Sequence, residues 1–212
     1  MKGIVIQLQE EALSNESDIL SLLRKAYLIA RKLKLQEFQA WISSEQNGYE
    51  LCNEVPSYRK VRGEIKAWNP YHGWIPVVFE KTTPLHEHDV VDPMASLVEV
   101  YNNADGKDCL INFPSEINSY LSKYSKWTTK FSLHVSANQF YNIIEQVKNK
   151  ILDWAITLEE NGIVGEDLQF TSEEKARALN EPTIVNYTNN FYSDVKKIQI
   201  QQDTQNSQQE IE

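Results

Sequence analysis

Apolar residues at helical spacing dominate the first part of the chain, residues 1–47. Between residues 19 and 33 they recur every three or four positions, which is typical of an amphipathic helix, and Asn15 is placed to cap it. The basic residues of this helix suit its solvated face, or else a nucleic-acid-binding face. A further helical segment ends at Gly48 and places four apolar side chains on one face: Leu35, Phe38, Trp41 and Ile42.

From residue 58 the period of the pattern changes to two. Val61, Ile65 and Ala67 share one face of the segment 58–68, and charged side chains occupy the other, which predicts a half-buried strand. An Asn-Pro pair at residues 69 and 70 interrupts this strand. A second extended segment follows, and its Pro76 suits an edge strand or a bulge. The sequence therefore predicts a strand–turn–strand element.

Shorter elements come next, followed by one long helix. Asp92 and Pro93 mark a helix start, residues 109–113 predict a strand, and residues 115–123 predict a short helix. Residues 130–135 alternate, so we expect a strand with Ser132 and His134 on its polar face. A capping pattern from residue 171 to 174 opens a last short helix. The long helix ends at Gly162 and has a continuous apolar face: Phe140, Ile143, Ile144, Val147, Ile151, Trp154, Ala155 and Leu158.

These elements predict an α+β fold: a mainly helical N-terminal group, a small and largely antiparallel sheet, and a long C-terminal helix. A chain of 212 residues is long enough for one domain with a proper core and an appendage. We place the domain at residues 1–182 and treat residues 183–212 as a separate tail.

The tail, residues 183–212, is rich in Asn, Gln, Ser and Thr and contains no Gly or Pro. Such a segment cannot bury enough apolar surface to fold alone. Ile198 and Ile200 alternate with polar residues, and Gln201 and Gln202 follow them, a pattern that suits a strand formed against another chain. We expect a homo-oligomer assembled through this tail, with a plain soluble extension as the alternative.

Composition and charge narrow the classes of function. The formal net charge of -9 argues against non-specific nucleic-acid binding by the surface as a whole, although a local basic strip remains compatible with it. Cys52 and Cys109 show neither zinc-site spacing nor a disulfide framework, which favours a reducing compartment. Since the N-terminus does not resemble a signal peptide and no apolar run reaches membrane-spanning length, we expect a cytoplasmic protein without a membrane partner.

A cationic strand face beside a cluster of aromatic side chains is the most informative candidate site. Cations next to stacking surfaces suit a nucleotide, a single strand of nucleic acid, or an acidic partner. Alternatively, the tryptophans fill the junction between helices and sheet while the cations are solvated. The ligand-binding candidates are Lys60, Arg62, Lys66, Trp68, Tyr71, His72 and Trp74.

The polar segment 86–92 is a candidate metal site. His86 and His88 would point the same way on a strand, and Asp89 and Asp92 supply oxygen ligands for zinc or manganese. The alternative is a solvated loop leading into a capped helix, because no two of these residues lie at an established metal-motif spacing. The sequence also lacks a nucleophile elbow and a Gly-rich phosphate loop, so we expect no catalytic residue and no cofactor.

Three stretches of the chain together resemble the AbiTii domain, a family named after a component of a bacterial abortive-infection system against phages. In chain order they are "LQEEALSNESDILSLLRKAYLIARKLKLQEFQAWISSEQNGY", "VPSYRKVRGEIKAWNPYHGWIPV" and "IIEQVKNKILDWAITLEENGIVGEDLQFTSEEK". The tail "IQIQQDTQNSQQ" resembles a polar ending found on several unrelated bacterial defence-associated proteins. The resemblance implies a role in antiviral defence, and it brings no catalytic residues with it.

Our first hypothesis is therefore a non-catalytic, oligomerising sensor or adaptor in abortive infection, with other defence-system proteins or a phage protein as partners. A metal-dependent, nuclease-like toxin is the second hypothesis. A sensor that binds a nucleotide or nucleic acid is the third, and the acidic balance of the chain makes it less favoured.

Overall fold

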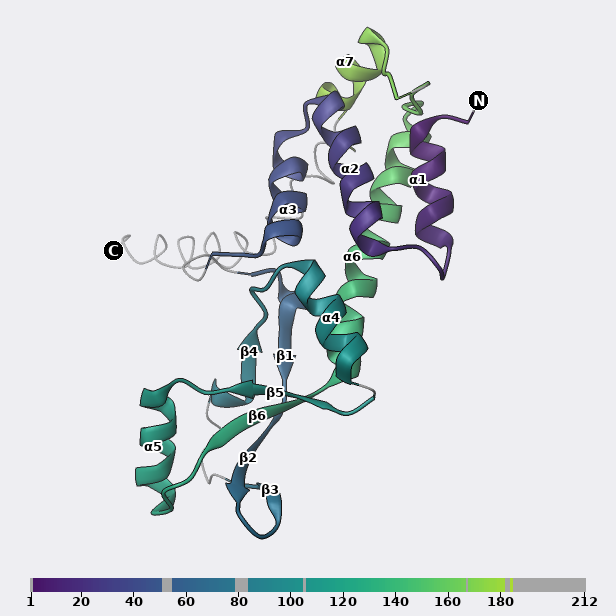
Figure 1. Cartoon of the computed structure of the whole chain (residues 1–212). Helices are drawn as coiled ribbons and strands as arrows, with labels where there is room; N and C mark the ends of the chain where they lie inside the picture. Colours follow the sequence, from purple (N-terminus) through teal and green to yellow (C-terminus); the bar gives the residue numbers. More distant parts are fainter. Residues whose placement is uncertain are drawn as a thin grey trace, which may run out of the picture. The chain divides into compact units, whose positions relative to one another are not determined.

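The computed structural model describes residues 2–50, 55–78, 84–104, 106–166, 168–181 and 184 (Figure 1). The chain divides into two compact units. The helical unit comprises residues 1–57, 91–95 and 144–212, and the sheet unit comprises residues 58–90 and 96–143. Except for Ile184, which is buried, the predicted tail with its oligomerisation candidates lies outside the described residues.

The helical unit confirms the predicted N-terminal group of helices. Its elements are α1 (Ile4–Leu13), α2 (Ile19–Leu33), α3 (Gln36–Asn47), α7 (Ser172–Asn180) and, from residue 144 onward, α6 (Ala137–Glu160). Gly48 ends α3 as predicted, with a φ of 92°. The start of α2 differs, because the carboxylate of Asp18 caps it and accepts hydrogen bonds from the amides of Leu20 and Ser21, both at 3.1 Å. The prediction of Asn15 as the cap was wrong.

α6 carries the core of the helical unit on its predicted apolar face. The ring of Trp154 stacks on that of Phe38 from α3, with centroids 4.0 Å apart. Although α6 has 24 residues, neither it nor any other described helix is long and apolar enough to cross a membrane. In the helical unit the predicted face is buried throughout: Ile144, Val147, Ile151, Trp154, Ala155 and Leu158.

A single carboxylate organises the loop between α6 and α7. Thr171 and Glu174 form the predicted capping box at the start of α7. The Glu174 carboxylate also accepts hydrogen bonds from the amides of Val164 and Gly165, at 3.0 and 2.9 Å. Burial alone would raise the pKa of Glu174, but the hydrogen bonds from Gly165, Thr171 and Val164 outweigh it and hold the pKa below its ordinary value.

The sheet unit contains two antiparallel sheets, as Figure 1 shows. A two-stranded sheet pairs β1 (Lys60–Arg62) with β4 (Glu87–Asp89). A four-stranded sheet has the order β3-β2-β6-β5 and consists of β2 (Glu64–Asn69), β3 (Gly73–Pro76), β5 (Asp108–Asn112) and β6 (Phe131–Ser136). The unit also contains the helices α4 (Met94–Ala104), from residue 96, and α5 (Ser115–Ser125), and α6 up to residue 143. The predicted α+β class with a small antiparallel sheet is confirmed.

Gly63 divides the long strand predicted over residues 58–68. β1 lies before it and β2 after it, and the two belong to different sheets. A Cβ atom at Gly63 would lie 2.4 Å from the carbonyl oxygen of His134, so the close approach of the two backbones requires glycine. The predicted inward face is nevertheless confirmed, because Val61, Ile65 and Ala67 are all buried.

β6 departs from the predicted alternation. Its residues Phe131, Leu133 and Val135 are buried as expected, but Ser132 and His134 on the opposite face are buried too. β6 is an inner strand, between β2 and β5, so side chains of its neighbours flank both of its faces. The predicted strand is confirmed, and the polar side chains of its second face are buried as well.

Candidate functional site

One face of the four-stranded sheet gathers aromatic and polar side chains. Residues directly opposite each other in neighbouring strands share a face, and the register pairs Trp68 with Trp74, Lys66 with Ser132, and Glu64 with His134. We call this the polar face. Its members on the four strands are Glu64, Lys66, Trp68, Trp74, Pro76, Asp108, Leu110, Asn112, Ser132, His134 and Ser136.

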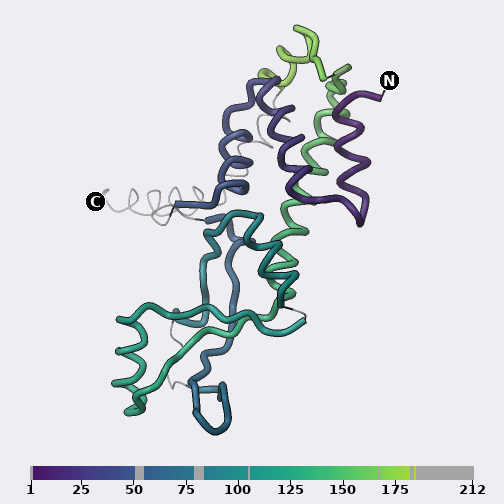
Figure 2. The backbone as a smooth tube through the Cα atoms, viewed as in Figure 1, coloured from purple at the N-terminus to yellow at the C-terminus, as the bar shows by residue number. Residues whose placement is uncertain are grey.

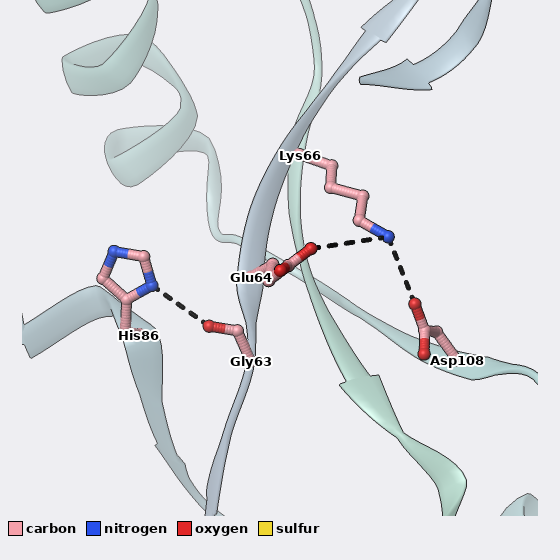
Figure 3. A network of polar contacts seen from close by, with 5 residues as sticks. All are labelled: Gly63, Glu64, Lys66, His86 and Asp108. Carbon is pink, nitrogen blue, oxygen red and sulfur yellow. Dashed lines mark hydrogen bonds and ion pairs between the residues drawn. The ribbon is translucent and has the colours of Figure 1, made fainter. Parts of the chain in front are cut away.

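Lys66 ties the two sides of the polar face together. Its Nζ atom lies 3.2 Å from Oδ2 of Asp108 and 3.9 Å from Oε2 of Glu64. Figure 3 draws both contacts as dashed lines. Since β6 lies between β2 and β5, the Lys66 side chain must extend across β6 to reach Asp108. The side chain is 18% exposed. Lys66, a sequence candidate for binding a ligand, is therefore already paired with two carboxylates.

His134 occupies the middle of the polar face and is 7% exposed. The Trp74 ring contacts the imidazole edge-on, with centroids 5.1 Å apart. Burial lowers the pKa of His134 below its ordinary value, and Lys66 lowers it further, while Asp108 and Glu64 act in the opposite direction. Within the described part of the chain, neither Nε2 of His134 nor the buried Oγ of Ser132 finds a hydrogen-bond partner.

Trp68 and Trp74 lie opposite each other next to the turn of the hairpin formed by β2 and β3. Their rings meet edge-on, with centroids 5.4 Å apart and planes inclined at 70°. Trp68 keeps 42% of its surface exposed. These two residues line an open pocket of about 530 Å³ together with Thr128, Thr129 and Lys130.

The turn of this hairpin is internally hydrogen-bonded. Oδ1 of Asn69 accepts hydrogen bonds from the amides of Tyr71, at 2.8 Å, and His72, at 3.2 Å. Figure 2 shows the resulting closed loop of the chain between β2 and β3. His72 is exposed, and Tyr71 projects from the loop with 92% of its surface exposed. The turn thus has a defined shape and presents an aromatic side chain at its tip.

One main-chain hydrogen bond and one from a side-chain hydroxyl hold the pocket loop, residues 128–130, against the hairpin. The Trp68 amide donates to the carbonyl of Lys130 at 2.9 Å, and the Thr129 hydroxyl donates to the carbonyl of Trp68 at 2.5 Å. Lys130 is exposed and forms no ion pair with the residues that the structure describes. The sequence prediction did not include Lys130. A usable signal was present, since the chain has no acidic residue between Glu116 and Glu145.

The other predicted cations, Lys60 and Arg62, lie on β1, in the two-stranded sheet, and not beside the tryptophans on β2 and β3. Both are exposed. Nζ of Lys60 is 3.8 Å from Oδ1 of Asp89. The side-chain amide of Gln139 binds the main chain of Arg62 twice: its Oε1 accepts from the Arg62 N–H at 2.8 Å, and its Nε2 donates to the Arg62 carbonyl at 2.6 Å. The structure therefore separates two of the three predicted cations, Lys60 and Arg62, from the aromatic residues, and leaves Lys66 on the same face as Trp68.

The metal candidates are spread over different elements. Nδ1 of His86 is 3.0 Å from the carbonyl oxygen of Gly63, a contact drawn in Figure 3, and the Gly63 amide donates to the His86 carbonyl at 2.9 Å. His88 and Asp89 lie on β4, opposite residues 61 and 60 of β1, and Asp92 belongs to the helical unit. The described residues include no group of three or more His, Cys, Asp or Glu side chains arranged to hold a metal ion.

Comparison with known proteins identifies the family. The AbiTii family model matches residues 3–183, a segment that runs through both compact units and includes every helix and strand named above. Neither the curated proteins nor the solved structures with which the chain was compared include a match. Because the family model matches most of its length, the chain belongs to the AbiTii family, which is associated with abortive-infection defence against phages.

Proposed function

We propose that this AbiTii protein acts in abortive infection as a sensor or adaptor that works by binding and not by catalysis. The observation that carries the proposal is the exposed aromatic hairpin, where Trp68 is 42% and Tyr71 is 92% exposed beside an open pocket. Large aromatic side chains dominate recognition surfaces because they bury much area and lose little conformational freedom. We therefore assign recognition of the infection signal to this hairpin.

The way in which the hairpin is anchored supports a binding role. The Asn69 side chain stabilises its turn, and the hydroxyl of Thr129 bonds its main chain to the pocket loop. At its base, Lys66 joins β2 to β5 through Asp108. A surface held in one shape before it meets its partner loses less entropy on binding. We expect that partner to be another defence-system protein or a component of the phage, met in the cytoplasm.

The second part of the proposal concerns residues 183–212, whose alternating isoleucines and abundant glutamines favour strand pairing between identical chains. Self-association through Ile198, Ile200, Gln201 and Gln202 would link several hairpins and strengthen weak individual contacts. We expect a chain truncated after residue 182 to show a smaller mass in light scattering than the full chain. An unchanged mass would exclude this role of the tail.

A plaque assay with the intact system tests the recognition role. We expect the double variant Trp68→Ala and Tyr71→Ala to lose protection against phage while its thermal unfolding stays cooperative. Leu13→Ala is the matched control, because Leu13 is a large apolar residue with 69% exposure on α1. Full protection by the double variant would rule out the hairpin as the recognition surface.

A His88→Ala variant distinguishes the sensor from the metal-dependent nuclease. The sensor proposal predicts that this variant keeps its protection against phage, since His88 lies on β4 and not in the hairpin. Loss of protection in this variant, together with a metal ion retained by the purified wild-type protein, would favour the metal-dependent enzyme over the sensor.

A further inference from the structure

We propose that the pocket beside Trp68 and Trp74 binds single-stranded nucleic acid, with a base stacked on the exposed indole and the phosphates along Lys130, Lys126 and Lys123. The inference rests on the proposed function, because it names the chemical class of the signal that the hairpin recognises. Single-strand binding sites combine aromatic platforms for the bases with cations that follow the backbone. The pocket and its flanking segment contain both.

The stacking surface comes from the hairpin. The edge-on contact between Trp68 and Trp74 holds the two rings at 70° to each other, and 42% of Trp68 stays accessible. A pocket of about 530 Å³ lies within the size range of sites that take small ligands, so it accommodates a base. Tyr71, 92% exposed at the adjoining turn, offers a second aromatic surface for a neighbouring base. Every base has a π-face, so such a surface is tolerant of sequence.

The charge comes from the segment that follows α5. Lys123, Lys126 and Lys130 are exposed, and none of them forms an ion pair or a side-chain hydrogen bond with the residues that the structure describes. Between Glu116 and Glu145 the sequence has no acidic residue that would neutralise them. In a chain with a net charge of -9, this segment is a local basic strip of the kind that phosphates require.

Hydrogen bonds connect the end of this basic segment to the pocket loop. Lys126 adopts a left-handed conformation with φ 55° and ends α5, and the amide of Trp127 donates to the carbonyl of Ser122 at 3.1 Å. The Ser122 hydroxyl in turn donates to the carbonyl of Thr129 at 3.3 Å. The end of α5 is therefore hydrogen-bonded to the pocket loop. Of the three lysines, Lys130 lines the pocket, and Lys126 and Lys123 lie on the segment that leads to it.

A single strand fits this arrangement better than a duplex. In a duplex the bases stack on each other and offer only their edges, whereas a single strand can insert an unstacked base beside Trp68. Thr128 is exposed at the pocket, and its hydroxyl is not engaged by any described residue, so it is available to a base edge or a phosphate oxygen. Polyglutamate would use the lysines but has no flat ring to stack on the indole.

The test measures binding of full-length protein to labelled oligouridine and oligothymidine of about 12 nucleotides, within the usual site sizes. Fluorescence anisotropy over a salt series is compared with a duplex of equal length, uridine monophosphate and polyglutamate. We expect the single strands to bind and the other probes to bind far more weakly. Trp68→Ala should weaken single-strand binding roughly 5- to 150-fold. Lys130→Gln should reduce the slope of log K against log salt by about 0.7, and Lys60→Gln should change neither quantity.

Absence of single-strand binding at low salt would overturn the inference. Equal binding of duplex or polyglutamate, or an unchanged affinity in Trp68→Ala, would overturn it too. Each of these results would mean that the protein binds through general attraction between charges and not through stacking on the indole. Failure of the proposed function looks different in the plaque assay. If the hairpin double variant loses protection although the wild type binds no oligonucleotide, the hairpin recognises a protein. If Trp68→Ala abolishes oligonucleotide binding and the double variant still protects, the site is real but is not the sensor.

Discussion

The indole ring of Trp74 meets the imidazole of His134 edge-on, with centroids 5.1 Å apart and ring planes inclined at 65°. Trp74 lies on β3 and His134 on β6, so this contact spans the intervening strand β2. It connects the exposed hairpin with a buried, titratable residue at the centre of the sheet. The stability of the proposed recognition surface is therefore coupled to the protonation of His134.

This coupling predicts a loss of stability in mild acid. Burial and Lys66 lower the pKa of His134 from its ordinary value of 6.5. The unfolded chain then binds a proton at a higher pH than the folded chain, so stability decreases as the pH falls below 6.5 and toward the folded pKa. In His134→Leu the melting temperature should drop less between about pH 7.5 and about pH 5.5 than in the wild type.

His72→Gln is the control for this effect, because His72 is exposed in the hairpin turn. It should keep the pH dependence of the wild type. If His134→Leu and the wild type lose the same number of degrees over this interval, another group is responsible for the acid sensitivity.

Glu174 predicts a second pH dependence in a more acidic range. Its hydrogen bonds to main-chain amides outweigh burial and hold its pKa below the ordinary 4.5, so its contribution to stability is complete above pH 4.5 and is lost as the pH falls through the folded value. Glu174→Gln should lower the free energy of unfolding by roughly 1–3 kcal/mol near neutral pH, since several amides lose a charged acceptor. Urea denaturation measures this loss.

Glu173→Gln is the control, because Glu173 is one position earlier and exposed, and it should change stability by less than about 0.5 kcal/mol. Equal losses in both variants would contradict the role of Glu174 as the acceptor for these amides.

Features encoded by neighbouring residues were predictable from the sequence. The capping box of Thr171 and Glu174, the glycine stop at Gly48 and the apolar face of α6 all depend on spacings of a few residues. The position of the α2 cap could not be predicted in the same way, because Asn15 and Asp18 are both good capping residues and the local sequence does not distinguish them.

Features that depend on distant segments were missed. A period of two in residues 130–135 predicts a strand, but it does not show that β6 is an inner strand, and this order is what buries Ser132 and His134. Likewise, Asp108 pairs with Lys66 only because β5 and β2 lie on either side of β6. The sequence analysis also grouped Lys60 with the tryptophans, because the local pattern does not show that the chain changes from one sheet to the other at Gly63.

The stack of Phe38 on Trp154 predicts a large effect of truncation in the core of the helical unit. Both side chains are fully buried, and their centroids are 4.0 Å apart. Trp154→Ala should lower the free energy of unfolding by about 3–5 kcal/mol in urea denaturation. Ile156→Ala on the same helix, at a site 38% exposed, should have a much smaller effect.

Trp154→Phe separates the packing of this residue from its polar atom. The buried indole N–H finds no acceptor among the residues that the structure describes, so its removal eliminates an unsatisfied donor. We therefore expect Trp154→Phe to lose less than half as much stability as Trp154→Ala. Equal losses would mean that the indole nitrogen is satisfied in solution.

Gly63 and Gly106 predict two different consequences of the same substitution. At Gly63 an added Cβ would lie 2.4 Å from the carbonyl oxygen and 2.9 Å from the carbonyl carbon of His134, and neither backbone atom can move aside without disturbing β6. At Gly106 nothing lies within 4 Å, but φ is +73°, which L-residues adopt with strain.

Gly106→Ala should therefore destabilise the protein by about 1 kcal/mol and leave the sheet intact. Gly63→Ala should cost more than about 2 kcal/mol and also weaken the contact between Trp74 and His134, visible as a changed tryptophan fluorescence spectrum. Equal effects of the two substitutions on unfolding and fluorescence would show that the backbones at Gly63 and His134 are not in close contact.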